Sequence, residues 1–161
     1  MARYRRNFIS GGTFFFTVKL ADPKSRLLVE HISLLRAAYM DVQEQYPFET
    51  VAVCVLPNHI HAIWTLPPDD ADYSLRWRLI KTKFSAHFPR TENLSASKQR
   101  RNERGIWQRR FYEHTVRNET DLQRCTRTTS ISIPSNMDCV AMSATGHFRR
   151  FTVMFGIDGC C

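Results

Sequence analysis

The chain has 161 residues, a length that suits one domain with a hydrophobic core better than two. Hydrophobic residues make up 43% of it, and no apolar run or leader is long enough for a membrane span, so we expect a cytoplasmic protein without a membrane partner. Lys and Arg number 23 against 15 Asp and Glu, and this net charge of +8 favours a polyanionic partner such as nucleic acid, with a merely solvated basic surface as the alternative.

The first half of the chain predicts one strand, one long helix and a hairpin. Residues 13–20 are rich in β-formers and follow two glycines, which is typical of a strand entered through a turn. Apolar residues recur at spacings of three and four over 25–45, which predicts an amphipathic helix. Residues 48–56 and 60–66 are apolar and separated by a short turn, so they are predicted to pair antiparallel.

A second helix and a fourth strand complete the predicted domain. Residues 74–87 have an apolar face and basic residues elsewhere, and 107–116 is predicted as a strand after a charged loop. The order βαββαβ predicts an α+β, ferredoxin-like antiparallel sheet with helices on one face. The opposite face is then expected to be free for binding or reaction.

The composition changes after residue 124. Four of the five cysteines lie beyond it, and the segment 125–161 contains no Trp, Lys or Glu. The odd number and irregular spacing of the cysteines exclude a regular disulfide framework. We therefore predict a domain over residues 1–124 and an irregular tail over 125–161.

Two histidines on the third predicted strand are candidate metal ligands. His59 and His61 stand at positions i and i+2, so their imidazoles project from the same face while Ile60 points to the other. A His-x-His pair on its own also arises as two hydrogen-bonded surface residues. Its wider context favours the metal interpretation.

Six segments that occur in this order resemble the REP-associated tyrosine transposases, a family of single-tyrosine HUH transposases. They are residues 4–6, 11–18, 47–49, 55–67, 74–81 and 105–114. The resemblance implies a ferredoxin-like nuclease that cleaves and joins single-stranded DNA near hairpins, as a monomer or homodimer. It also implies that His59 and His61 hold Mg²⁺ or Mn²⁺, with a third oxygen ligand that the sequence does not identify.

The resemblance places the family's nucleophilic tyrosine at residue 128, where this chain has Thr128. Inferred codons for residues 128–139, read in another frame, give Asp-Tyr-Ile-His-Phe-Asn-Pro-Ile-Lys-His-Gly-Leu, which is family-like. A short insertion after the Arg124 codon restores this frame. We therefore predict a frameshifted tail that is poorly ordered and that lacks the catalytic helix.

Other residues are candidates for the nucleophile and for DNA contacts. Tyr112 is the candidate substitute nucleophile, with packing or stacking as the alternative, and His114 is a ligand, a DNA contact or a structural residue. Trp77 and Trp107 can each stack on bases or pack in the core. The residues predicted to contact DNA are basic, apart from one tryptophan: Arg5, Arg6, Arg76, Trp77, Arg78, Lys81, Arg109 and Arg110.

Three functions remain open from the sequence. The chain is an active transposase, a DNA-binding remnant or pseudogene product without catalysis, or an unrelated small metalloprotein that uses His59 and His61.

Overall fold

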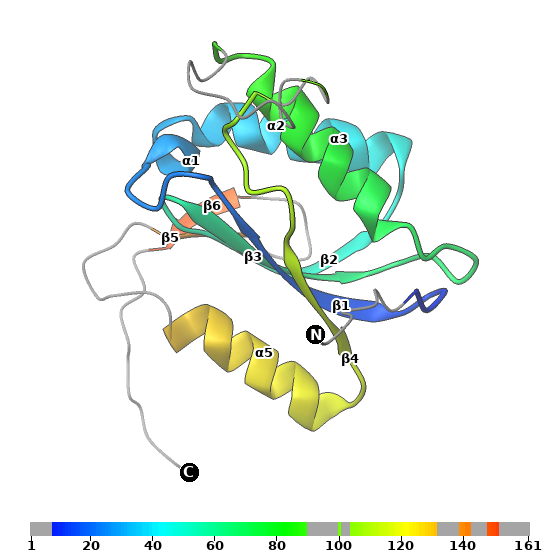
Figure 1. Cartoon of the computed structure of the whole chain (residues 1–161). Coiled ribbons are helices and arrows are strands. Elements are labelled where there is room, and N and C mark those ends of the chain that lie inside the picture. The colour runs from blue at the N-terminus through cyan, green and yellow to red at the C-terminus, as the bar shows by residue number, and fades with distance from the viewer. Residues whose placement is uncertain (1–7, 90–99, 101–103, 132–138, 143–147, 152–161) are drawn as a thin grey trace.

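The structure is a computed structural model that describes residues 8–89, 100, 104–131, 139–142 and 148–151. Its centre is an antiparallel sheet in which the described strands have the order β4-β1-β3-β2-β5-β6 (Figure 1). The strands are β1 Thr13–Lys19, β2 Glu49–Val55, β3 His59–Thr65, β4 Tyr112–Val116, β5 Cys139–Met142 and β6 Phe148–Phe151.

The order β4-β1-β3-β2 of the first four strands is the ferredoxin-like arrangement, so the predicted fold class is confirmed. The predicted hairpin between β2 and β3 is also present. Leu56 donates its backbone N–H to the carbonyl of His59 at 2.8 Å, which closes the turn over Pro57 and Asn58. This turn fixes where β3 begins and hence the register of both histidines.

The first half of the chain contributes two helices where one was predicted. They are α1 Leu27–Glu30 and α2 Ile32–Gln45, and the backbone leaves helical geometry at His31, with φ −117° and ψ 38°. The third helix, α3 Tyr73–Ser85, begins at Asp72, whose side chain accepts the N–H of Leu75 at 2.8 Å. No helix in the described ranges is long and apolar enough to cross a membrane.

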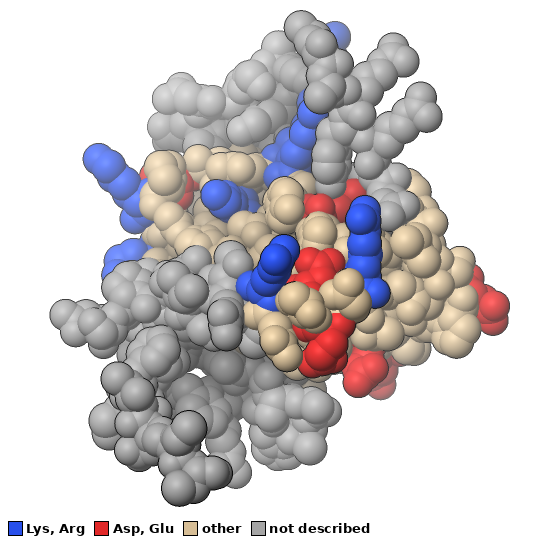
Figure 2. Space-filling view, turned by 90° about the horizontal axis from the view of Figure 1, so that it is seen from below, with Lys and Arg blue, Asp and Glu red and all other residues tan. Residues whose placement is uncertain are grey.

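Helix α5, Glu119–Ile131, lies on the face of the sheet opposite α2 and α3 (Figure 1). The expectation that this face is free is therefore wrong. Leu122 and Cys125 of α5 pack against Phe15 of β1 and Ile63 of β3 in a small apolar cluster. Seen from the α5 side, the described surface carries basic and acidic side chains next to one another (Figure 2).

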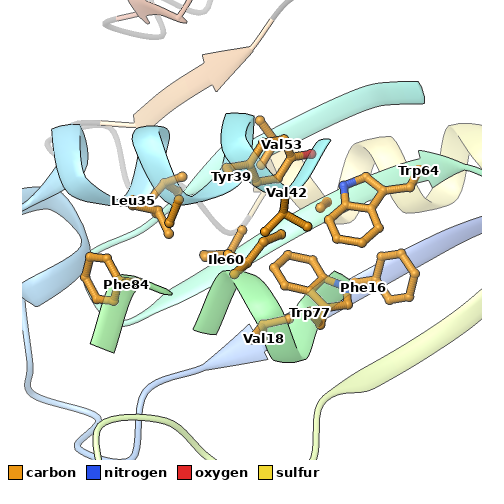
Figure 3. Packing of buried hydrophobic residues seen from close by; sticks show 14 of the residues in the cluster. Phe16, Val18, Leu35, Tyr39, Val42, Val53, Ile60, Trp64, Trp77 and Phe84 are labelled. Atoms are coloured by element: carbon orange, nitrogen blue, oxygen red, sulfur yellow. The ribbon is translucent and has the colours of Figure 1, made fainter. Parts of the chain in front are cut away.

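The main hydrophobic core lies between the sheet and helices α2 and α3. Strand residues of alternate positions point into it, which is why Phe16, Ile60 and Trp64 are buried beneath the helices (Figure 3). Trp64 stacks on Trp77 of α3 with ring centroids 4.3 Å apart and an interplanar angle of 14°. This aromatic contact joins the sheet to α3 and packs against the face of β3 opposite the histidines.

The tail prediction needs correction in three places. Residues 125–131 continue α5, and β5 and β6 are regular strands, with Val53 to Val55 of β2 paired to β5. Backbone pairing to an exposed strand edge tolerates many sequences, and no proline interrupts α5 before Pro134. The expected disorder of residues 132–138, 143–147 and 152–161 lies outside the described residues.

Candidate functional site

A row of four polar side-chain positions crosses the α5 face of the sheet. Residues paired directly on neighbouring strands lie on the same face, and the register pairs Tyr112 with Thr17, Thr17 with His61, and His61 with Cys54. His59 lies on the same face two residues before His61 and is paired with Lys19. The sheet therefore brings the histidine pair and Tyr112 to one surface.

Two neighbouring oxygens orient the imidazoles. The Nδ1 atom of His59 lies 2.6 Å from Oδ1 of Asn58, and Nδ1 of His61 lies 3.0 Å from Oγ1 of Thr17. The ring centroids are 4.9 Å apart and the ring planes stand at 85°. Because these bonds involve the Nδ1 atoms, Nε2 is the nitrogen of each ring that they do not occupy.

Burial keeps both histidines uncharged. Desolvation lowers the pKa of His61 from 6.5 to about 4, with smaller contributions from the positive charges of His59 and Lys19. Burial and Lys19 also lower the pKa of His59. Both side chains are thus neutral at pH 7, the state in which an imidazole binds a metal.

The pair fits a divalent cation as two of its ligands. Each imidazole is neutral and held through Nδ1 by a second residue, the arrangement that orients metal-binding histidines in proteins. Among the described residues, no third His, Cys, Asp or Glu forms a ligand cluster with His59 and His61. The third ligand predicted from the sequence thus remains unidentified.

Tyr112 lies in the row of His61 but is separated from it by Thr17. Neighbouring strands are about 4.8 Å apart, so the backbones of Tyr112 and His61 are roughly 10 Å apart. The side chain of Tyr112 is 55% exposed and meets the ring of Phe15 at 6.4 Å between centroids. A phenol at this position is accessible from the same face as the histidines.

The helix on which the resemblance places the nucleophile is present, although the sequence analysis predicted its absence. Asn118 begins α5 by accepting the N–H of Asp121 at 2.9 Å, and Cys125 anchors it to the sheet. Both residues precede or adjoin the composition change, so the helix forms without the rest of the family block. Thr128 lies in α5, one turn beyond Cys125.

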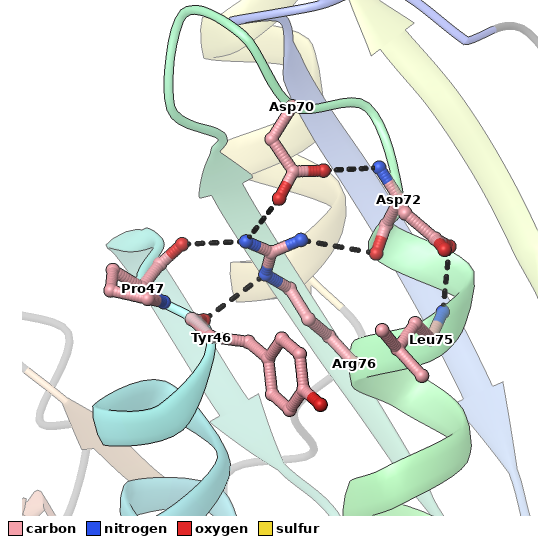
Figure 4. A network of polar contacts seen from close by, with 6 residues as sticks. All are labelled: Tyr46, Pro47, Asp70, Asp72, Leu75 and Arg76. Atoms are coloured by element: carbon pink, nitrogen blue, oxygen red, sulfur yellow. Dashed lines mark hydrogen bonds and ion pairs between the residues drawn. The ribbon is translucent and has the colours of Figure 1, made fainter.

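Arg76 and Trp77, two of the predicted DNA contacts, are instead structural residues. Trp77 is fully buried against Trp64, and Arg76 is 1% exposed. The guanidinium of Arg76 donates to the carbonyls of Tyr46 and Pro47, and its Nη2 lies 2.7 Å from a carboxylate oxygen of Asp70 (Figure 4). Neither side chain reaches the surface, so both leave the set proposed to contact DNA.

Four of the other predicted DNA contacts, Arg78, Lys81, Arg109 and Arg110, lie on or near α3. Arg78, Arg109 and Arg110 are exposed. Lys81 donates to the carbonyl of Gln108 at 2.8 Å, which places α3 beside the segment that leads into β4. Arg5 and Arg6 lie outside the described residues.

Trp107 and His114 are both tied to protein groups. Trp107 is 7% exposed and donates its indole N–H to Oγ of Ser85 at 3.0 Å, so the core alternative holds for it. His114 lies with Nε2 2.9 and 3.0 Å from the two carboxylate oxygens of Asp121. Cys125 stands close to this pair, and the three ligand atoms lie within 4.8 Å of one another.

The sequence analysis missed this cluster of His114, Asp121 and Cys125. The spacing of Asp121 and Cys125, four apart in a helix, places them on one side of α5 and was a readable signal. That signal required α5 to be recognised first. The backbone N–H of Arg117 and then His114 lower the pKa of Asp121, whereas burial and then Asp121 raise the pKa of the Cys125 thiol.

Comparison with known proteins gives two curated relatives. A REP-associated tyrosine transposase of Haemophilus influenzae is 44% identical over 123 residues, which are 76% of this chain and 70% of the relative. The REP-associated tyrosine transposase of Escherichia coli K12 is 46% identical over 121 residues, which are 75% of this chain and 66% of that protein. No family model matches the chain.

Two solved structures are similar to this one. A REP-associated tyrosine transposase bound to a REP hairpin has a TM-score of 0.64 and 43% sequence identity, and the match covers 77% of this chain and 67% of that one. A transposase structure from Deinococcus radiodurans has a TM-score of 0.50 at 18% identity and covers 80% of this chain and 96% of that one. The second match shows a common fold alone.

Proposed function

The chain belongs to the REP-associated tyrosine transposases, and from this membership we propose that it binds single-stranded DNA hairpins, with a backbone phosphate at His59 and His61 on the α5 face of its sheet. Membership removes the alternative of an unrelated small metalloprotein. The observation that carries the proposal is the pair His59 and His61, neutral and oriented through Nδ1 on that face. A location in the cytoplasm and a monomeric or dimeric state stay predictions.

We assign Mg²⁺ or Mn²⁺ to His59 and His61. Such a cation, when bound, supplies polarisation of a phosphoryl oxygen and stabilises charge that develops at phosphorus. The chain's own contribution is to keep the two imidazoles neutral at pH 7 and to fix the planes of their rings through Asn58 and Thr17. Exposed Arg78, Arg109 and Arg110 supply positive charge for the DNA backbone.

Strand cleavage in the family requires a tyrosine oxygen that bonds to phosphorus while the bond from phosphorus to the 3′ oxygen breaks. Thr128 stands at that position here. An aliphatic hydroxyl is far less acidic than a phenol, so Thr128 is a poor replacement. We propose that the present chain binds hairpins without cleaving them. Tyr112 stays the candidate substitute nucleophile.

The test uses the full chain, Mn²⁺ and a labelled single-stranded hairpin, with an unpaired strand of the same composition as the control ligand. We expect preferential retention of the hairpin on a native gel and no covalent adduct on a denaturing gel. A version with the reading frame restored after Arg124 is expected to form the adduct. Equal binding of both DNAs by the present chain contradicts the proposed function.

If the present chain does form an adduct, Tyr112→Phe shows whether Tyr112 or another residue is the nucleophile. The substitution removes the hydroxyl and keeps the ring that packs near Phe15. Loss of the adduct in Tyr112→Phe identifies Tyr112 as the nucleophile and overturns the proposal that this chain only binds. An adduct that survives in Tyr112→Phe requires a nucleophile elsewhere in the chain.

A further inference from the structure

We propose that His114, Asp121 and Cys125 form a second metal site, suited to Zn²⁺, which fastens α5 to β4. The inference is independent of DNA binding and of the pair His59 and His61. It stands on three potential ligands of different chemistry that come from two elements and meet beside the sheet. Among the described residues, these three form a group of potential metal ligands whose donor atoms lie close together.

The donor set selects the class of metal. An imidazole nitrogen, a carboxylate oxygen and a thiolate sulfur together match Zn²⁺, which accepts all three, whereas Mg²⁺ prefers oxygens alone. The fourth tetrahedral position is left for water. The cluster therefore favours a different metal from the Mg²⁺ or Mn²⁺ proposed at His59 and His61.

The backbone arrangement brings the ligands together. Asp121 and Cys125 are four residues apart in α5 and so project from one side of the helix, one turn apart. His114 faces them from β4, and its Nε2 already lies 2.9 Å from Oδ2 of Asp121. Tetrahedral Zn²⁺ places such ligand atoms about 3.3–3.6 Å apart, so the histidine and aspartate must separate slightly and the sulfur must move closer.

Neighbouring groups already hold the ligands in position. The backbone N–H of Arg117 donates to Oδ2 of Asp121 at 3.1 Å, and Asn118 fixes the first turn of the helix. Cys125 is 7% exposed and packs with Phe15 and Ile63, which limits the motion of its side chain. Such support around the ligands is typical of metal sites in proteins.

The experiment titrates the full chain with Co²⁺, whose absorption reports a bound thiolate, and then with Zn²⁺ in competition. We expect a thiolate-to-cobalt charge-transfer band that Zn²⁺ abolishes, and a higher melting temperature with Zn²⁺. Cys125→Ser is expected to lose the band and to weaken Zn²⁺ binding at least tenfold. Cys54→Ser, which removes another buried cysteine on the same face, is expected to keep both.

Two further variants keep the test decisive. Cys125→His replaces one zinc ligand by another, so it is expected to lose the cobalt band and to keep the Zn²⁺-dependent rise in melting temperature. His59→Gln combined with His61→Gln is expected to retain the band. A band that persists in Cys125→Ser, or no band in the unaltered chain, overturns the proposed site.

Discussion

At the scale of single residues, the pattern Arg76-Trp77-Arg78 shows how one helix separates three neighbouring roles. Basic and aromatic residues next to one another favour a nucleic-acid interface in sequence. In the structure Trp77 lies in the core, Arg76 is buried among carbonyl groups and Arg78 is exposed. The rotation of α3 about its axis determines which of the three side chains is exposed, because Tyr73, Trp77 and Phe84 lie on its buried side.

Arg76→Ala is expected to lower the free energy of unfolding by about 3–5 kcal/mol, because it leaves buried carbonyls and Asp70 without their donor. Urea denaturation measures the change. The matched control is Arg78→Ala, which alters an exposed arginine of the same helix and is expected to change stability by less than about 0.5 kcal/mol. Equal stability of the two variants contradicts a structural role for Arg76.

His61 makes the stability of the fold depend on pH. Its pKa is about 4 in the folded chain and 6.5 without the fold, so the unfolded chain binds more protons between these values. The stability that the neutral imidazole contributes is complete above pH 6.5 and is lost as the pH falls toward 4. The loss amounts to about 2–3 kcal/mol, which urea denaturation at pH 7.5 and pH 4.5 measures.

The control for this dependence is His61→Gln, which has no titrating group at this position. Its stability is expected to change less between the two pH values than that of the unaltered chain. Because the pKa of His59 is lowered in the same direction, a smaller dependence is expected to remain. An unchanged pH dependence in His61→Gln would place its origin elsewhere.

At the scale of elements, β1, β2 and β3 could be predicted because their apolar residues are long runs with clear turns between them, whereas β4 begins at Tyr112 and not at residue 107 as predicted. The predicted β1 and β3 agree with the observed strands to within one residue at each end. The break between α1 and α2 could not be predicted, since the apolar spacing continues through His31. Helix α5 was missed because its packing residues, Leu122 and Cys125, are few.

Asn118 offers a test of how α5 is held. Asn118→Ala removes the side-chain acceptor for the N–H of Asp121 and is expected to destabilise the helix by about 1 kcal/mol. Hydrogen exchange of the amides of α5 measures this as faster exchange, with the amides of β1 as the internal reference. Asn118→Asp keeps an oxygen acceptor and is expected to exchange like the unaltered chain.

At the scale of the whole molecule, the chain has a net charge of +8, and the face seen in Figure 2 carries acidic as well as basic side chains. We therefore expect DNA affinity to depend on a local set of side chains. Arg78, Lys81, Arg109 and Arg110 lie on α3 or on the segment adjoining it. The frame of the tail stays a prediction, because much of residues 125–161 lies outside the described ranges.

Hairpin binding is expected to weaken with salt because each neutralised phosphate releases counterions. With about four phosphate contacts to a single strand, affinity falls about 50-fold between 50 and 200 mM salt. Arg109→Ala combined with Arg110→Ala is expected to make this dependence shallower, as measured by fluorescence anisotropy over a salt series. A slope that does not change would remove these two arginines from the interface.

The alternation of β3 has a further consequence for length changes in the gene. His59 and His61 face α5 while Ile60, Ala62 and Trp64 face the core, so losing one residue within the strand exchanges the two sets beyond the deletion. Substitutions can impair the histidine pair while the core stays intact. A single-codon deletion in β3 instead puts an imidazole into the hydrophobic interior and an indole on the opposite face. We therefore expect such a deletion to abolish the fold, whereas substitutions of the histidines affect the function alone.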